Sequence, residues 1–345
     1  MDFIVNVIMV FLSFIVSSIP ILLYIWFVWW LDHHDREPLV LIALAFFWGA
    51  VASIVISIVF ELILSIPLFF FPEAFQKVAN YVVLAPVTEE IVKSLILFIL
   101  FFHRKFNRVL DGIVYGAVVG FGFAASENII YYTSTYFTQG VGLWVIVVVL
   151  RTIFTSVGHA VWTSVTGAGV ALMKFSRQKW MRFVFPPLAI LTAVLLHSLF
   201  NLGAVLTEFY SIVFFVISTL VVFFGLVVIG VAISIALHDE STCIRTQLAD
   251  ELRNGVVTEE EYGLVHSYLR RRRASFRILA EYGYEKYRFA NRLLDFELDL
   301  AFSKDEMDNS SSAKQRKELL KRVNGLRDSI KSMRKKLGES AKMLK

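Results

Sequence analysis

The chain has 345 residues, of which 57% are hydrophobic and only 18% are charged, and its net charge is +5. Apolar runs of about 20 residues or more, the length that a helix needs to cross a bilayer, recur from Phe3 to Leu237. This composition excludes an ordinary soluble globular protein, and so small a net charge requires no nucleic-acid partner.

From His238 onward the composition becomes charged and polar. We therefore predict an all-α, polytopic membrane protein in two parts, a membrane domain over residues 1–237 and a helical cytoplasmic tail over residues 238–345. The N-terminus lacks a basic region, so the first apolar run is expected to be a retained span and not a cleaved signal peptide. The single cysteine, Cys243, forms no internal disulfide and says little about the redox compartment.

The apolar runs predict about seven transmembrane helices. They cover about residues 3–31, 39–66, 81–102, 110–132, 141–173, 183–206 and 209–237. A neutral loop is expected over residues 133–140, and residues 141–150 are expected to form a tilted extension or an interfacial helix, because the fifth run is too long for one untilted crossing. In the fourth run, Gly112, Gly116 and Gly120 recur every four residues, which is typical of a face for close helix packing.

Positive charge orients the chain in the cell membrane. The loops after the second, fourth and sixth predicted spans carry only Lys77. The loops after the first, third and fifth carry Arg36, Arg104, Lys105, Arg108, Lys174, Arg177, Lys179 and Arg182. Because Lys and Arg are enriched in cytoplasmic loops, the N-terminus is expected outside and the tail in the cytoplasm.

The tail carries three local signals. Thr258 to Glu261 predicts a capping box that opens a helix. The basic run Arg270 to Arg273 indicates a solvated helix face or a contact with lipid headgroups. A heptad pattern of apolar residues predicts packing against another helix, either the preceding tail helix near residues 287–301 or a second chain. Its members are Leu319, Val323, Leu326, Ile330, Met333 and Leu337.

The membrane domain also contains ionisable residues, which cost at least a few kcal/mol each in a bilayer core unless they are paired or hydrated. Glu89, Glu90 and Lys93 lie within about one helical turn, so the lysine can reach either carboxylate. At a rise of about 1.5 Å per residue, five groups share one layer at or above the midplane. They are Glu89, Glu90, Glu127, His159 and His197. Glu61, in contrast, lies near the outer boundary and is expected to be solvated.

This polar layer has the residue types that activate a water molecule. A carboxylate can act as general base, and Lys93 can keep its partner ionised. A histidine can orient the water or protonate a leaving amine, and His197 with Asn201, four residues apart, can stabilise an oxyanion. Arg151 lies about two turns outward of His159. Catalysis is expected to require either no cofactor or a single zinc ion, and the metal-free form is slightly favoured because close His-x-x-x-His spacing is missing. The candidate ligands of a zinc ion are Glu90, Glu127, His159 and His197.

Six stretches together resemble the PrsW-type intramembrane proteases, within the superfamily of CAAX-prenyl and bacteriocin-processing proteases. They begin at Asp35 (DREP), Pro86 (PVTEEIVK), Asp111 (DGIVYG), Gly122 (GFAASEN), Gly158 (GHAVW) and His197 (HSLFN). The family pattern Glu-Glu-x-x-Lys falls on Glu89, Glu90 and Lys93. Phe-x-x-x-Glu falls on Phe123 and Glu127, and the family histidines fall on His159 and His197.

The resemblance implies hydrolysis of a peptide bond in or near the membrane segment of a membrane-anchored protein, such as an anti-sigma factor. Glu90 or Glu89 would activate the water, with help from Glu127. Two alternatives remain at this stage. A transporter or channel would also place carboxylates and histidines near the midplane, although the apolar residues 95–102 and 113–119 favour a cavity open only to the outside. A non-catalytic scaffold would act through the tail heptads, by a helix partner or by self-association.

Overall fold

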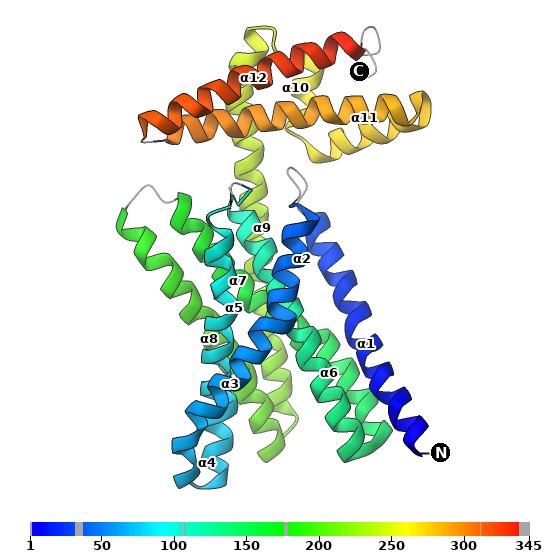
Figure 1. The fold of residues 1–345 in the computed structure, drawn as a ribbon, viewed down its shortest axis with the longest axis vertical. Helices are drawn as coiled ribbons and strands as arrows, with labels where there is room; N and C mark the ends of the chain where they lie inside the picture. The colour runs from blue at the N-terminus through cyan, green and yellow to red at the C-terminus, as the bar shows by residue number, and fades with distance from the viewer. Residues whose placement is uncertain are drawn as a thin grey trace. The chain divides into compact units, whose positions relative to one another are not determined.

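The structure is a computed structural model that describes residues 2–31, 37–103, 105–106, 108–175, 179–310 and 312–337. The predicted all-α class is confirmed, since these residues form helices and turns without a strand (Figure 1). The chain divides into two compact units, and the boundary along the sequence falls after Ile233. Four loop residues used in the sequence analysis, Asp35, Arg36, Arg104 and Arg177, lie outside the described residues.

The membrane unit is a bundle of long helices joined by short irregular turns. Its helices are α1 (Asp2–Leu31), α2 (Leu39–Phe47), α3 (Ile54–Ser65), α4 (Glu73–Val78), α5 (Ala85–Leu100), α6 (Val109–Leu150), α7 (Ser156–Phe175), α8 (Lys179–Phe209) and α9 (Val213–Arg253). The π-helical turns are η1 (Trp48–Ser53), η3 (Ala79–Leu84) and η4 (Arg151–Thr155), and η2 (Ile66–Phe70) is a 3₁₀ turn. Single π-helical turns inside longer helices are frequent at functional sites.

Five helical runs in the described part are long and apolar enough to cross a membrane. They are Phe3–Trp30, Leu39–Phe70, Val109–Met173, Met181–Phe209 and Val213–Arg253. The 65-residue run Val109–Met173 contains a sharp break at Gly140, so it covers two of the predicted spans. The predicted span over residues 81–102 is helical but charged, and it is not among the five. The total of seven spans therefore stays a prediction.

The predicted neutral loop over residues 133–140 is wrong, because α6 remains helical up to the break at Gly140. Gly140 has φ 78° and ψ −178°, a conformation that L-residues rarely adopt and glycine adopts freely. The chain turns at this single residue, and residues 141–150 form a further helical segment that leads into η4.

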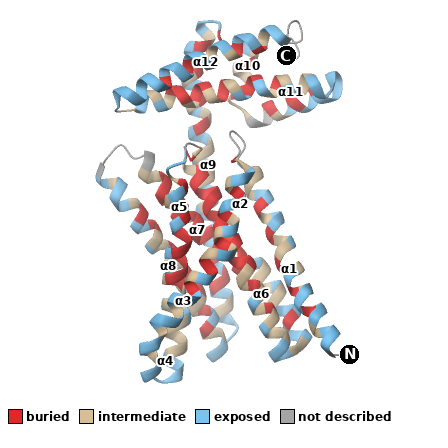
Figure 2. Ribbon diagram, in the orientation of Figure 1, coloured by how far each residue is buried: buried red, intermediate tan, exposed pale blue. Residues whose placement is uncertain are grey.

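The glycine face predicted in the fourth run packs directly on the backbone of α7. A Cβ added to Gly120 would lie 2.3 Å from the carbonyl oxygen of His159, and one added to Gly116 would lie 2.4 Å from that of Thr163. Small residues allow such close approach between membrane helices. The central parts of α6 and α7 are accordingly the most buried of the bundle (Figure 2). This contact fixes the height of His159 relative to the side chains of α6.

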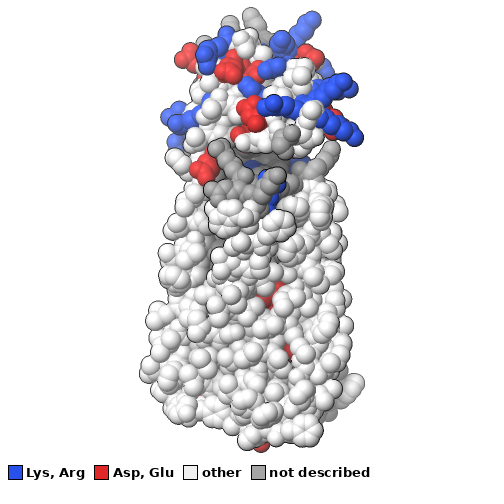
Figure 3. Space-filling model, turned by 90° about the vertical axis from the view of Figure 1, so that its left-hand side faces the viewer, with Lys and Arg blue, Asp and Glu red and all other residues white. Residues whose placement is uncertain are grey.

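The tail unit consists of α10 (Glu259–Val265), α11 (Tyr268–Asn309) and α12 (Ala313–Leu337) together with the end of α9. The predicted capping box is confirmed, since the Thr258 hydroxyl accepts a bond from Glu261 N at 3.3 Å and Thr258 N donates to Glu261 Oε2 at 2.7 Å. α11 breaks at Gly283, where φ is 79°. In the view of Figure 3, Lys, Arg, Asp and Glu crowd the tail unit, whereas the membrane unit is almost free of them.

The tail heptads pack within the chain itself. Val323, Ile330 and Met333 of α12 are buried in one apolar cluster with Leu293 and Leu294 of α11, and Leu326 packs against it. Leu319 is also buried. The helix partner is therefore the preceding tail helix, the first of the two predicted possibilities. The side chain of Leu337 lies outside the described residues.

Candidate active site

A cavity of about 850 Å³ opens in the membrane unit. Its walls come from α3, α4, η3, α5, α6, η4, α7, α8 and α9, which are far apart in sequence. The predicted site residues on these walls are Glu89, Phe123, Glu127, Arg151, His159, His197 and Asn201. The other two, Glu90 and Lys93, lie directly behind them and are fully buried. The structure therefore brings all the predicted site residues to one place.

Lys93 lies at the centre of this group. Its Nζ atom is 2.9 Å from Glu90 Oε1, 3.1 Å from Glu89 Oε2 and 2.9 Å from His159 Nδ1. The ammonium group also lies 3.8 Å from the centroid of the Phe123 ring, close enough for a cation–π contact. A charge removed from water to this extent is tolerated only when it is paired and hydrogen-bonded, and here every polar neighbour is an acceptor.

His159 has both ring nitrogens engaged. An ammonium group can only donate, so Nδ1 of His159 accepts the bond from Lys93. The proton of the neutral ring therefore resides on Nε2, which donates to Glu127 Oε2 at 2.8 Å. The ring is held further by Phe123, at a centroid distance of 5.3 Å, and by Trp162, at 5.0 Å.

Arg151 fixes the outer end of this chain of contacts. Its Nη2 atom lies 2.7 Å from Glu127 Oε2, and its Nε–H donates to Asn128 Oδ1 at 2.9 Å. The guanidinium group stacks over the Tyr131 ring at 3.7 Å from its centroid. Arg151 is the first residue of η4, and this irregular turn brings it level with Glu127 on α6. The predicted supporting role of Arg151 thus has a definite partner.

His197 is held by a carboxylate and by an indole ring. Its Nδ1 atom lies 3.1 Å from Glu90 Oε1, and its ring stacks on Trp162 with 4.1 Å between centroids. Glu90 accepts a further bond at Oε2 from the Thr163 hydroxyl at 3.1 Å. When Nδ1–H of a neutral His197 donates to Glu90, Nε2 is left as an acceptor. Trp162 and Thr163 were not identified as site residues from the sequence. The only sequence signal for them is that Trp162 ends the stretch that begins at Gly158 and that Thr163 directly follows it.

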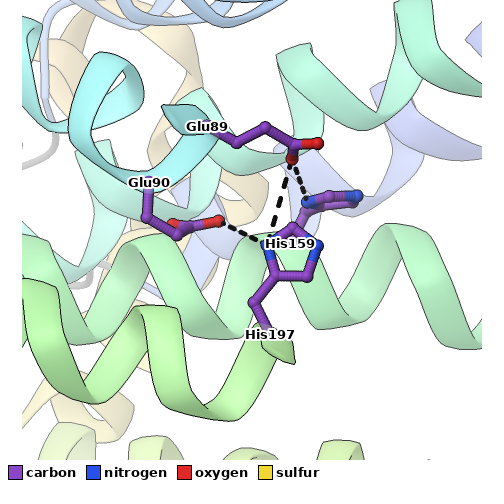
Figure 4. A group of neighbouring side chains, drawn as sticks. All are labelled: Glu89, Glu90, His159 and His197. Carbon is purple, nitrogen blue, oxygen red and sulfur yellow. Dashed lines mark hydrogen bonds and ion pairs between the residues drawn. The ribbon is translucent and has the colours of Figure 1, made fainter. Parts of the chain in front are cut away.

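The adjacent carboxylates differ in access. Glu90 has both oxygens bonded and is 0% exposed, whereas Glu89 is 6% exposed and lines the cavity. Glu89 Oε2 also lies 4.0 Å from His159 Nδ1 and 3.9 Å from His197 Nδ1 (Figure 4). Glu89 is therefore the member of the pair that a water molecule in the cavity can reach.

Asn201 lies on the same wall as His197 but has a partner of its own. Its Nδ2 group donates to the backbone carbonyl of Tyr81 in η3 at 2.8 Å. An amide NH₂ group has two N–H bonds, so one remains for a ligand in the cavity. Asn201 connects α8 to the irregular turn that precedes α5.

Glu61 is the residue that the sequence analysis undervalued. It lines the cavity, and its Oε1 atom accepts a bond from the Thr88 hydroxyl at 3.1 Å. It was expected to be a solvated boundary residue because its position near the end of an apolar run gives its depth but not its direction. Thr88 precedes Glu89 in α5, so Glu61 extends the acidic wall of the cavity.

Four side chains could together hold a metal ion. They are Glu89, Glu90, His159 and His197, and one donor atom from each lies within 4.8 Å of all the others. Two carboxylates and two imidazoles suit zinc. This set contains Glu89 in place of Glu127, which the sequence analysis had included. Lys93 Nζ is bonded to three of the four residues, so an ion at their centre would have to displace the ammonium group.

Comparisons with known proteins identify the family. The model of the PrsW family intramembrane metalloproteases matches residues 37–233. The chain is 28% identical to the Protease PrsW of Clostridioides difficile (strain 630) over 211 residues, which cover 60% of this chain and 85% of that protein. It is 26% identical to the Protease PrsW of Geobacillus kaustophilus (strain HTA426) over 163 residues, 45% of this chain and 66% of that protein. No solved structure matches.

The matched family model covers more than half of the chain and all the site residues, and it favours a protease over a transporter or a scaffold. The chain therefore belongs to the PrsW family of intramembrane proteases and is a membrane-embedded peptidase.

Proposed function

We propose that this peptidase hydrolyses a peptide bond in or near the membrane segment of a membrane-anchored protein, with a water molecule activated by Glu89. The observation that carries the proposal is the position of Glu89, which lies on the cavity wall within 4.0 Å of His159 and 3.9 Å of His197. Within the described residues, the contacts of Glu89 with Lys93, His159 and His197 all use Oε2.

The reaction requires one proton transfer in each direction. Glu89 accepts a proton from water while the oxygen attacks the scissile carbonyl carbon, which forms a tetrahedral oxyanion. Asn201 lines the same cavity, and the second N–H of its amide is a suitable donor to that oxyanion. When the C–N bond breaks, the proton passes from Glu89 to the leaving amine. The acceptor nitrogen of His197 can orient the attacking water.

The other polar residues hold this arrangement in place. Lys93 donates to Glu89 and Glu90 and so holds the two carboxylates in position, and Glu127 with Arg151 keeps His159 oriented. A zinc ion held by Glu89, Glu90, His159 and His197 would supply a Lewis acid for the carbonyl and for the water. A regulator such as an anti-sigma factor, with one membrane span, is a suitable substrate class for a cavity of this size.

The orientation in the membrane is part of the proposal. The loops after the first, third and fifth predicted spans carry eight Lys and Arg residues, whereas the loops after the second, fourth and sixth carry one. This difference supports an outer N-terminus and a cytoplasmic tail. This orientation is tested with single cysteines introduced at Gly142 and at Lys317, which are labelled with a membrane-impermeant reagent. We expect the first to react in intact cells and the second only after lysis.

The activity is tested with a panel of single-span reporters co-expressed with the chain. We expect the wild type to cut at least one reporter and Glu89→Gln to reduce that cleavage by about a thousandfold or more, since a general base and its alignment are both lost. Glu73→Gln makes the same chemical change on an exposed residue of α4 outside the cavity, and should leave cleavage unchanged. Full activity of Glu89→Gln at matched expression would overturn the proposed role of Glu89.

A further inference from the structure

The first half of α11 has an unusual outer surface. The described part of the tail after residue 238 has five exposed large apolar or aromatic side chains. Four of them fall in one stretch of nine residues of this helix, 276–284. They are Phe276, Leu279, Tyr282 and Tyr284, which are 56%, 37%, 46% and 68% exposed. The exception is Leu320 on α12. The exposed apolar side chains of the tail are thus concentrated in one short stretch, with Phe276, Leu279 and Tyr282 before the break at Gly283 and Tyr284 directly after it.

Arginines lie beside Phe276 on the outward half of the helix. From Tyr268 to Tyr284 the chain has five arginines and one acidic residue, Glu281. Arg270 and Arg273 are exposed and three residues apart, so they lie on the same side of the helix. The guanidinium group of Arg272 lies 4.8 Å from the centroid of the Phe276 ring.

The opposite face anchors the helix to the tail core through smaller residues. Ala274, Ser275 and Ile278 are buried, and Ile278 joins the apolar cluster of the tail. The Ser275 hydroxyl bonds to Asn291 Oδ1 at 2.6 Å, which ties the two halves of α11 together across the break at Gly283. An amphipathic helix of a water-soluble unit normally buries its large apolar residues and exposes polar ones. Here Ile278 and two small residues face inward, while the larger Phe276 and a second leucine-sized residue, Leu279, face outward.

This combination matches one environment, the surface of an anionic bilayer. Arginines pair with lipid phosphates, while aromatic and aliphatic side chains enter the boundary between headgroups and acyl chains. Arg270 follows the end of the last apolar run at Leu237 by 33 residues, so the chain itself keeps this helix near a membrane. An acidic protein surface would account for the arginines but would leave Phe276 and Leu279 exposed.

We propose that residues 270–284 bind anionic lipid headgroups and form a second membrane contact of the chain, outside the spanning helices. The surface consists of Arg270, Arg273, Phe276 and Leu279, which are exposed on the outward half of α11 before the break at Gly283. It does not depend on the protease reaction, because none of these residues lines the cavity.

The test uses the full chain in lipid nanodiscs, with an environment-sensitive fluorophore on the exposed position Ala280→Cys in a Cys243→Ser background. Discs of phosphatidylcholine alone are compared with discs that also contain phosphatidylglycerol. We expect a blue shift of the emission only in the anionic discs, and an increase of salt concentration should reverse it. An equal emission in both lipids would overturn the proposal.

Matched variants separate this surface from a general effect of charge. In the variant with Arg270→Gln and Arg273→Gln, the fraction of anionic lipid needed for the half-maximal shift should rise by about fivefold or more. Lys317→Gln with Lys321→Gln removes the same charge from exposed positions of α12, and should leave the shift unchanged. The variant Phe276→Ser with Leu279→Ser should weaken the shift without changing its salt dependence. Equal responses of the arginine and lysine variants would contradict a localised lipid surface.

Discussion

The ammonium nitrogen of Lys93 lies 2.9 Å from Nδ1 of His159, which makes a lysine the hydrogen-bond donor to the central histidine of the site. Because an ammonium group cannot accept, this contact places the imidazole proton on Nε2, where it is donated to Glu127. Lys93 thus has two effects, since it balances the charge of the carboxylates and selects the tautomer of His159.

The first prediction concerns the charge balance at Lys93. Lys93→Met leaves Glu89 and Glu90 as uncompensated buried carboxylates, and should lower the free energy of unfolding by about 3–5 kcal/mol. Adding Glu90→Gln should recover part of this loss, since one of the two charges is then removed. Thermal unfolding in detergent measures both variants, with Lys331→Met on the exposed face of α12 as control. If the double variant is less stable than Lys93→Met by the full loss that Glu90→Gln causes alone, Lys93 and Glu90 are not coupled.

The second prediction concerns zinc. Lys93 and an ion would compete for the same donors, because Lys93 Nζ bonds to Glu89, Glu90 and His159. Lys93→Met should therefore bind Zn²⁺ about tenfold more tightly than the wild type, and Lys93→Met with His197→Ala should lose that gain. Equilibrium dialysis followed by measurement of bound zinc gives the answer without any assay of cleavage. His103→Ala, at an exposed loop position, serves as control. Equal zinc affinity of Lys93→Met and the wild type would contradict the competition.

The third prediction concerns the glycine face of α6. Gly120→Ala would place a methyl group 2.3 Å from the carbonyl oxygen of His159, so α7 must move away. We expect a loss of about 1–3 kcal/mol in the free energy of unfolding and a larger relative loss of cleavage, because the shift displaces His159 from Lys93 and Glu127. Gly142→Ala meets no atom within 4 Å and should be neutral. A normal rate of cleavage in Gly120→Ala would show that the position of α7 does not limit catalysis.

The sequence was sufficient to group the central ionisable residues of the site. A helix advances by a fixed rise per residue, so the distance of a residue from the end of an apolar run gives its depth. Ionisable groups at the same depth of a bilayer have few partners except one another. For these reasons Glu89, Glu127 and His159 could be grouped although they come from α5, α6 and α7.

Rotation about a helix axis could not be predicted in the same way. Glu89 and Glu90 are neighbours in sequence and point in directions about 100° apart, so only the packing of α5 decides which of them lines the cavity. Glu61 was missed for the same reason. The irregular turns η3 and η4 add a further rotation, and they have no sequence signal as clear as a proline or a glycine. A break in the helix was expected over residues 133–140, but it is confined to Gly140 and the residues before it are helical.

The last prediction concerns a buried carboxyl group in the tail. Glu297 is 0% exposed, and neither of its carboxylate oxygens meets a hydrogen-bond donor among the described residues. Burial raises the pKa of Glu297 well above its usual value, the nearby charge of Glu261 raises it further, and Arg334 opposes them. The folded tail therefore favours the protonated form. Its stability is greatest below the unfolded pKa of about 4.3 and falls as the pH rises towards the folded pKa.

Glu297→Gln is neutral at every pH and should remove this decline, with a gain at pH 7–8 of about 1.4 kcal/mol for each pH unit by which the pKa is raised. Hydrogen exchange of the α11 and α12 amides in the full chain, measured from pH 5 to pH 8 and corrected for the intrinsic rate, reports the change. Glu285→Gln, on an exposed position of the same helix, should retain the decline of the wild type. If the stability of the Glu297→Gln tail falls with pH in parallel with that of the wild type, the pH dependence arises from another group. Glu297 would then be charged in the folded chain.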